Sequence, residues 1–311
     1  MPPEGRDRFV VEPLHKTAHS LRMEHRIDPL IAERAPWLYS DRPGTQLAKR
    51  CLHRLLGYDT TVDIAKALKD APSDLIMQAM SLRLAKMVQA NGLGHIPAHG
   101  SALIVANHPT GIADGIILNG LISAARPDAY FFANRDILRI FPQMQTMIAP
   151  VEWRKNQRSL AKARETMMYV RKATDTGRLG VIFPSGRLAK RRGLRLYERP
   201  WMASAAMLAR KFDLPVIPVN IQARNSALFY LFDLIHPTLR DITLFHETLN
   251  KARQPFKVTV GEPISAASIP TKPEDGIAML RKATLALGGK DAPTVNLVAT
   301  SRAFARPAIG E

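Results

Sequence analysis

Between residues 92 and 288, short apolar runs alternate with segments whose apolar residues recur at helical spacing, and this alternation restricts the fold most strongly. The runs predict strands at Ala102–Ala106, Ala129–Ala133, Leu179–Phe183, Val216–Ile221 and Phe256–Val260. The helical patterns cover Ala113–Ala124, Arg158–Thr174, Trp201–Phe212 and Pro273–Leu287. Such alternation is typical of a sheet covered by helices. The sequence therefore predicts an α/β fold with a central mixed, largely parallel sheet.

The remaining segments have different patterns. Residues 1–45 are rich in Pro, Arg and His with little periodicity, which predicts an extended or poorly ordered arm. Residues 46–91 predict an N-terminal helical segment, in which Ile76, Met80 and Leu84 fall on one face. We expect the α/β domain itself to span 92–288 and residues 289–311 to form an irregular tail.

Charge and cysteine content narrow the functional classes. Lys and Arg exceed Asp and Glu by 44 − 27 = 17, so anionic lipid, nucleic acid and phosphorylated small molecules are all candidate partners. Aromatic residues make up only 6% of the chain and no nucleic-acid motif is present, which argues against a specific nucleic-acid partner. The single cysteine, Cys51, excludes an intrachain disulfide and a multi-cysteine metal site.

No apolar run reaches the length of a membrane-spanning helix, and the first twenty residues lack the apolar core of a secretory signal. We therefore expect a protein of the cytoplasm and, if a membrane is involved, one that lies on its surface.

The stretch VANHPTGIADG, residues 105–115, contains the first candidate site. It follows a predicted strand and precedes a helix, so His108 and Asp114 would lie at a strand's carboxyl end, where open α/β sheets bind ligands. His108 could act as a proton shuttle whose ring Asp114 orients. Equally, Asp114 could cap the following helix while His108 is an ordinary loop residue. Taken alone, the stretch is more typical of the cap.

A second stretch, GRLGVIFPSGRLAKRRGLR, ends an apolar strand in Pro184, Ser185 and Gly186 and continues into a run of Arg and Lys that begins at Arg187. Such a turn exposes backbone N–H groups, and clustered Arg side chains bind phosphate. A solvated basic surface is an equally good interpretation. The stretches APVEWR, ending in Arg154, and LPVIPVNI indicate nothing by themselves beyond short apolar runs.

In this order, the four stretches resemble the conserved blocks of the PlsC-like glycerophospholipid and lysophospholipid acyltransferase superfamily. The resemblance covers about residues 85–265. NHPTGIADG, with five residues between His108 and Asp114, and ARNSALFYLFDLIHPTLRDITLFHETLNK (223–251) are similar to its hemolysin-like branch, some of whose members acylate lyso-ornithine lipids.

The resemblance implies an O-acyltransferase. It would move a fatty acyl group from acyl-CoA or acyl-carrier protein to a hydroxyl of a lysolipid, either 1-acylglycerol-3-phosphate or a lyso-amino-lipid. His108 would be the general base and Asp114 its orienting carboxylate. The implied substrate-binding residues are Asn107, Arg154, Pro184, Ser185, Gly186 and Arg187.

The same resemblance implies no cofactor and no metal, because the thioester is a co-substrate. It also implies a location on the inner face of the cell membrane, against an anionic lipid surface. One residue departs from the superfamily pattern: Ser185 stands where most members have a glutamate that positions the acceptor. This departure keeps an alternative open, a non-catalytic lipid- or phosphate-binding protein on an acyltransferase scaffold.

Overall fold

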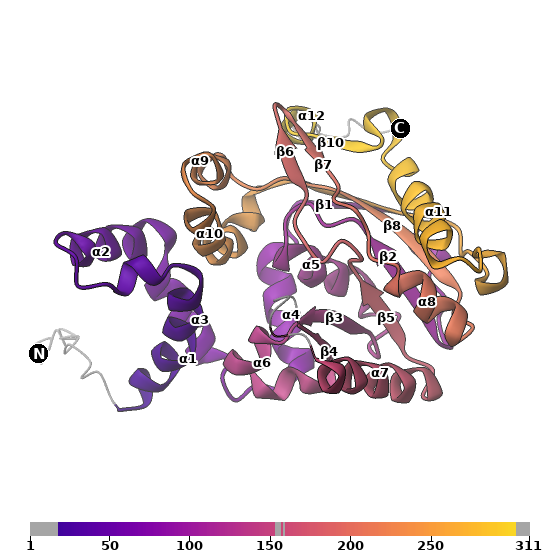
Figure 1. The fold of residues 1–311 in the computed structure, drawn as a ribbon, viewed down its shortest axis with the longest axis horizontal. Coiled ribbons are helices and arrows are strands. Elements are labelled where there is room, and N and C mark those ends of the chain that lie inside the picture. The colour runs from indigo at the N-terminus through magenta and orange to yellow at the C-terminus, as the bar shows by residue number, and fades with distance from the viewer. Residues whose placement is uncertain (1–17, 153–156, 158, 303–311) are drawn as a thin grey trace, which may run out of the picture.

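The chain folds around a seven-stranded sheet with the strand order β1-β9-β8-β2-β5-β3-β4 (Figure 1). A computed structural model describes residues 18–152, 157 and 159–302. The strands of this sheet are β1 (Val88–Asn91), β2 (Ala102–Ala106), β3 (Tyr130–Asn134), β4 (Ile148–Val151), β5 (Leu179–Ile182), β8 (Val216–Gln222) and β9 (Phe256–Val260). Neighbours pair in parallel except β8 and β9, which are antiparallel. The predicted mixed, largely parallel sheet is confirmed.

Strand β2 shows why this sheet is covered on both faces. Its five residues are all buried, as expected for a central parallel strand. Ala102, Ile104 and Ala106 contribute to one apolar core, whereas Leu103 and Val105 contribute to a second core on the other face. Residues at the carboxyl end of β2 are therefore held from both sides.

Helices cover both faces of the sheet, and those nearest the N-terminus extend beyond it (Figure 1). Those of the N-terminal half are α1 (Ala18–Arg34), α2 (Thr45–Leu56), α3 (Tyr58–Ala67), α4 (Ser73–Leu84), α5 (Ile112–Ile122) and α6 (Asp136–Ile140). Those that follow are α7 (Leu160–Asp175), α8 (Ser204–Lys211), α9 (Ala227–Ile235), α10 (Pro237–Asn250), α11 (Pro273–Ala286) and α12 (Ala299–Arg302).

A second, small antiparallel sheet stands above the main one. It has the order β10-β7-β6, from β6 (Lys190–Arg192), β7 (Arg195–Tyr197) and β10 (Thr294–Asn296). The β6–β7 hairpin projects from the molecule next to α9 in Figure 1. It carries the Arg- and Lys-rich stretch that follows β5.

The terminal segments correct the sequence prediction. The arm predicted for 1–45 is wrong over 18–39, where α1 and a 3₁₀ turn (Pro36–Tyr39) occur. Met23, Ile27, Leu30 and Ile31 are buried on one face of α1 and supply the packing that orders it. Residues 1–17 lie outside the described part of the chain.

Two smaller boundaries also differ from the prediction. The predicted helical segment 46–91 ends in the edge strand β1, which pairs with β9. The predicted irregular tail contains β10, which pairs with β7, and the short helix α12. Both strands are only three or four residues long, so they depend on their partners in the sheet and leave little periodicity in the sequence.

Candidate active site

Asp114 caps helix α5 from inside its first turn. Its fully buried carboxylate accepts hydrogen bonds from the backbone N–H groups of Thr110 (2.9 Å) and Gly111 (3.0 Å) to Oδ2, and from the Thr110 hydroxyl (2.5 Å) to Oδ1. Gly111 has a φ of +97°, and a Cβ there would lie 3.0 Å from a methyl carbon of Leu188. Glycine is thus required for the tight turn that brings the loop back to Asp114.

The same carboxylate faces His108. Nδ1 of His108 lies 3.0 Å from Oδ2 of Asp114, a close contact that is off the line of an ideal hydrogen bond. The imidazole stacks on Phe183 with ring centroids 4.3 Å apart, and 18% of the side chain is exposed. Since Asp114 faces Nδ1, Nε2 is the ring nitrogen left for a substrate. The sequence left two roles open for Asp114, a helix cap and a partner of His108, and in the structure the same carboxylate makes both contacts.

A buried carboxylate that sequence reasoning missed also supports the His108 loop. Oε2 of Glu198 accepts the backbone N–H of His108 (3.1 Å), and Oε1 accepts the indole N–H of Trp201 (3.0 Å). Burial raises the pKa of Glu198, although the bonds from Trp201 and His108 oppose that shift. A signal was available: Glu198 continues the inward-facing alternation of β7 after the buried Leu196.

The turn after β5 is closed by internal hydrogen bonds. Pro184 and Ser185 are buried, and the Ser185 hydroxyl donates to the Arg187 carbonyl (2.8 Å). Ser185 also lies next to Glu198, where its hydroxyl opposes the rise in the pKa of that carboxyl group. Gly186 adopts a φ of +58°. Gly186 and Arg187 are exposed, so these two residues of the predicted set face the surroundings.

The sequence also predicted that Asn107 and Arg154 bind substrate. Asn107 is buried, and its side chain is used within the fold. Its amide N–H donates to the Ile221 carbonyl (2.9 Å), and its Oδ1 accepts the Ile221 N–H (2.6 Å). It therefore ties the end of β2 to β8 instead of facing a ligand. Arg154 lies outside the described residues.

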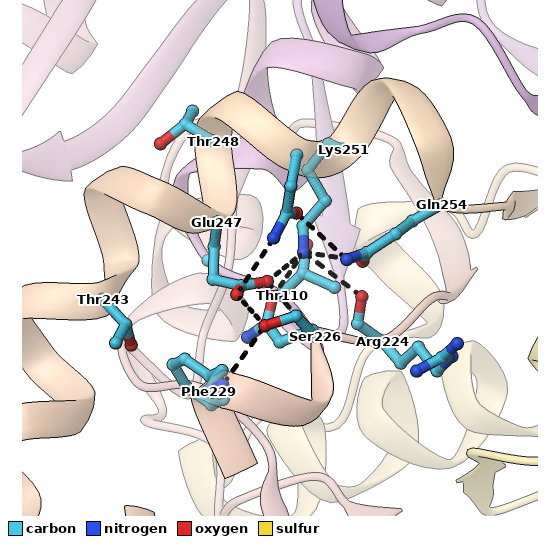
Figure 2. A network of polar contacts seen from close by, with 12 residues as sticks. Thr110, Arg224, Ser226, Phe229, Thr243, Glu247, Thr248, Lys251 and Gln254 are labelled. Atoms are coloured by element: carbon cyan, nitrogen blue, oxygen red, sulfur yellow. Dashed lines mark hydrogen bonds and ion pairs between the residues drawn. The ribbon is translucent and has the colours of Figure 1, made fainter. Parts of the chain in front are cut away.

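A buried ionic network around Lys251 and Glu247 lies next to Thr110 (Figure 2). The Lys251 ammonium donates to Glu247 (2.8 Å), the side-chain oxygens of Asn225 (2.6 Å) and Gln254 (2.9 Å), and the Arg224 carbonyl (3.2 Å). All four partners are acceptors, which is the environment of a charged ammonium.

This network joins the start of α9 to α10 and lies beside the His108 loop. Burial by itself would raise the pKa of Glu247, but the adjacent Lys251 and bonds from Ser226 hold it below its ordinary value. Lys251 and Asp114 attract one another, and Figure 2 shows Thr110 next to the network. Among the described residues, no three His, Cys, Asp or Glu side chains gather in a way that could hold a metal ion.

Comparisons with known proteins show what the segment that carries this site is similar to. Residues 87–222 match the family model described as Acyltransferase, which covers β1 through β8 and both His108 and Asp114. Two curated relatives are lyso-glycine lipid O-acyltransferases. The one from Phocaeicola vulgatus is 23% identical over 63% of this chain and 72% of its own length. The one from Bacteroides thetaiotaomicron is 21% identical over 76% and 87%.

Among solved structures, the 1-acyl-sn-glycerophosphate acyltransferase PlsC from Thermotoga maritima matches with a TM-score of 0.48 and 15% identity, over 85% of this chain and 99% of that one. The family-model match and the curated relatives support the acyltransferase resemblance drawn from the sequence.

Proposed function

We propose that this chain, a member of the PlsC-like acyltransferase family, transfers a fatty acyl group from a thioester to the hydroxyl of a lysolipid, with His108 as general base. The observation that carries the proposal is the contact between His108 Nδ1 and the buried Asp114 at the carboxyl end of β2. The donor would be acyl-CoA or acyl-carrier protein.

The arrangement can perform the reaction without a serine or cysteine nucleophile. His108 Nε2 removes the proton of the acceptor hydroxyl as its oxygen attacks the thioester carbonyl carbon. Asp114 stabilises the imidazolium that forms. Collapse of the tetrahedral intermediate breaks the C–S bond, and the imidazolium returns the proton to the departing thiolate. The products are an ester and a free thiol.

Charge that develops on the carbonyl oxygen needs donors near His108. The backbone N–H groups of Thr110 and Gly111 are already used by Asp114. Asp114 does not engage those of Ile112 and Ala113, which also lie in the first turn of α5, where the helix dipole favours negative charge. We assign them to the oxyanion.

The acceptor's head group would contact the turn after β5. Arg187 is exposed there, and its guanidinium suits a phosphate or carboxylate. The names of the curated relatives support a lyso-amino-lipid over a glycerophosphate acceptor. No helix in the described part of the chain is both long and apolar enough to cross a bilayer. With a net charge of +17, a peripheral position on the anionic inner face of the cell membrane fits the proposal.

The test is acyl transfer by the purified protein with labelled acyl-CoA and acyl-carrier protein against a panel of lysolipids that includes lyso-glycine, lyso-ornithine and lysophosphatidic acid. We expect ester formation with one thiol released per product. His108→Ala should abolish transfer, whereas His99→Ala, in an exposed loop before β2, should not. Vesicle binding without turnover on any donor–acceptor pair would instead favour the non-catalytic lipid-binding alternative.

A further inference from the structure

Two arginine side chains from separate segments of the chain act on Tyr230, in the first turn of α9. The guanidinium of Arg191, from β6, lies 5.9 Å from the centroid of the Tyr230 ring. Arg224 precedes Asn225, whose backbone N–H donates to the Tyr230 hydroxyl (3.1 Å). Burial raises the pKa of that hydroxyl, and the positive charges of Arg224 and Arg191 oppose the rise. Both guanidinium groups therefore lie near the same side chain.

Neither guanidinium is neutralised by an acidic side chain in the described part of the chain. There, the Nε atoms of Arg191 and Arg224 are buried without a hydrogen-bond partner, and no carboxylate lies within ion-pair distance of either group. Glu247, whose charge also acts on Tyr230, is already paired with Lys251 at 2.8 Å. A cation that is partly withdrawn from water is costly until an opposite charge joins it, so two such cations indicate a site for an anion.

The Tyr230 hydroxyl adds a neutral donor to the two cations. It accepts the Asn225 N–H and stays protonated at neutral pH, so its own proton is left to donate. Figure 2 shows the Arg224 guanidinium directed away from the Lys251 ammonium, so this group is not used by the buried network. Guanidinium N–H groups and a phenol O–H together suit the oxygens of a carboxylate or a phosphate.

The two arginines flank the loop that holds His108. On one side, the N–H of Ala189 donates to the His108 carbonyl (2.9 Å), and Arg191 follows two residues later along the chain. On the other side, β8 runs parallel to β2, and Arg224 follows two residues after β8 ends. An anion held by both arginines thus lies near the carboxyl ends of β2 and β8, where open α/β sheets bind ligands.

We propose that Arg191, Arg224 and the Tyr230 hydroxyl bind the anionic head group of the lysolipid acceptor, a carboxylate or a phosphate. An acceptor anchored there presents its own hydroxyl to His108. The cluster acts in addition to Arg187, which is exposed at the turn after β5. The inference rests on the proposed function and deepens it, because it names the side chains that select the acceptor by its charge.

The experiment measures kcat and the KM for the acceptor separately, using the full chain, an excess of the acyl donor and short-chain lysolipids that stay monomeric. Arg191→Gln and Arg224→Gln should each raise the KM for the acceptor by about tenfold or more, because charge-assisted bonds are lost, and change kcat by less than about threefold. Tyr230→Phe keeps the ring beside Arg191 and should raise this KM by about threefold.

The matched control is Arg192→Gln. Arg192 is exposed and neighbours Arg191 on β6, so its side chain points to the opposite face of the hairpin. This control removes the same charge and should keep the wild-type KM for the acceptor. Thermal unfolding of every variant shows whether its fold is retained.

A second arm tests whether the cluster recognises charge. The acceptors are a lysolipid with a carboxylate head group, lysophosphatidic acid, and for each an uncharged analogue, the carboxamide and the monoacylglycerol. The wild type should have a KM about tenfold or more higher for the uncharged analogue of its acceptor, and this preference should disappear in Arg191→Gln and Arg224→Gln. The head group for which the KM rises most in these variants identifies the anion as carboxylate or phosphate.

Three results would overturn the proposal and leave the proposed reaction standing. One is a wild-type KM for the acceptor in folded, active Arg191→Gln and Arg224→Gln variants. Another is an equal loss in the Arg192→Gln control. The third is a rise in the KM for the donor instead of the acceptor, because the cluster would then hold a phosphate of the donor. Conversely, calorimetric binding of the lysolipid that needs both arginines, without ester formation, would refute the proposed reaction and leave the anion site intact.

Discussion

Replacing Asp114 by asparagine should remove the charge opposite His108 while preserving the loop. The Oδ2 position accepts the N–H groups of Thr110 and Gly111 and faces Nδ1 of His108, so the asparagine carbonyl fits there. Its amide then faces the Thr110 hydroxyl, which can reverse and accept. The substitution therefore leaves no buried donor facing another donor.

The magnitude follows from the 3.0 Å separation of Nδ1 and Oδ2. At an effective dielectric constant of about 20, an imidazolium and a carboxylate at that distance attract by roughly 5 kcal/mol. Since each ~1.4 kcal/mol is a factor of ten in rate, the loss in kcat has a ceiling near 10⁴-fold. A neutral carbonyl recovers part of the attraction, so we expect Asp114→Asn to lower kcat by about 10²- to 10⁴-fold.

The assay is thiol release from the acyl donor at saturating acceptor, with urea unfolding on the same samples. The stability of Asp114→Asn should fall by about 1–3 kcal/mol as charge-assisted bonds become neutral ones. Thr110→Val is the matched control, because it removes one donor to Asp114 but keeps the charge. Its stability should fall by a similar amount while kcat changes less than about tenfold. If the two variants lose kcat equally, the charge of Asp114 has no special role and the reasoning is refuted.

Three further substitutions test the surroundings of the site. Glu198→Gln should be less destabilising at pH 8 than at pH 5. Burial raises the pKa of the Glu198 carboxyl group, so the contribution of this side chain to the free energy of unfolding is fully present at low pH and falls as pH rises. Urea unfolding at both pH values measures the difference. Lys251→Met should lower the free energy of unfolding by about 3–5 kcal/mol in the same assay, because it leaves the Glu247 carboxylate buried without its cation. Adding Glu247→Gln to this variant should restore part of the lost stability. Gly111→Ala should lower both thermal stability and kcat, since φ is +97° and the new methyl group meets Leu188; unchanged values would show that the loop tolerates a side chain there.

The central strands were the most predictable part of the fold. The predicted bounds Ala102–Ala106 and Phe256–Val260 coincide with β2 and β9. β2 is a continuously buried apolar run, whereas β9 alternates buried apolar residues with more exposed ones, and both patterns are typical of strands. Helix α1 was missed although Met23, Ile27 and Leu30 already show helical spacing, because the surrounding Pro, Arg and His residues obscured it. Its order comes from tertiary packing, which local composition does not encode.

The candidate site was predictable only in its local part. His108 and Asp114 are six residues apart, so one loop can bring them together, and the turn geometry could be anticipated from Gly111. Glu198 reaches the same loop from 90 residues away, through a hairpin whose pairing no local pattern specifies. The role of Asn107 was missed for the same reason, since its partner, Ile221, belongs to a strand more than a hundred residues later.

The measurement that tests the account most directly is the rate of ester formation by His108→Gln beside wild type and His99→Ala, with the acceptor that the wild type uses. Glutamine has about the size of the imidazole but cannot take up a proton at neutral pH, so it separates proton transfer from packing. The account predicts that His108→Gln stays folded and loses at least about 10²-fold in kcat, the usual contribution of a general base, while His99→Ala retains the wild-type rate. A folded His108→Gln variant with wild-type kcat would contradict it.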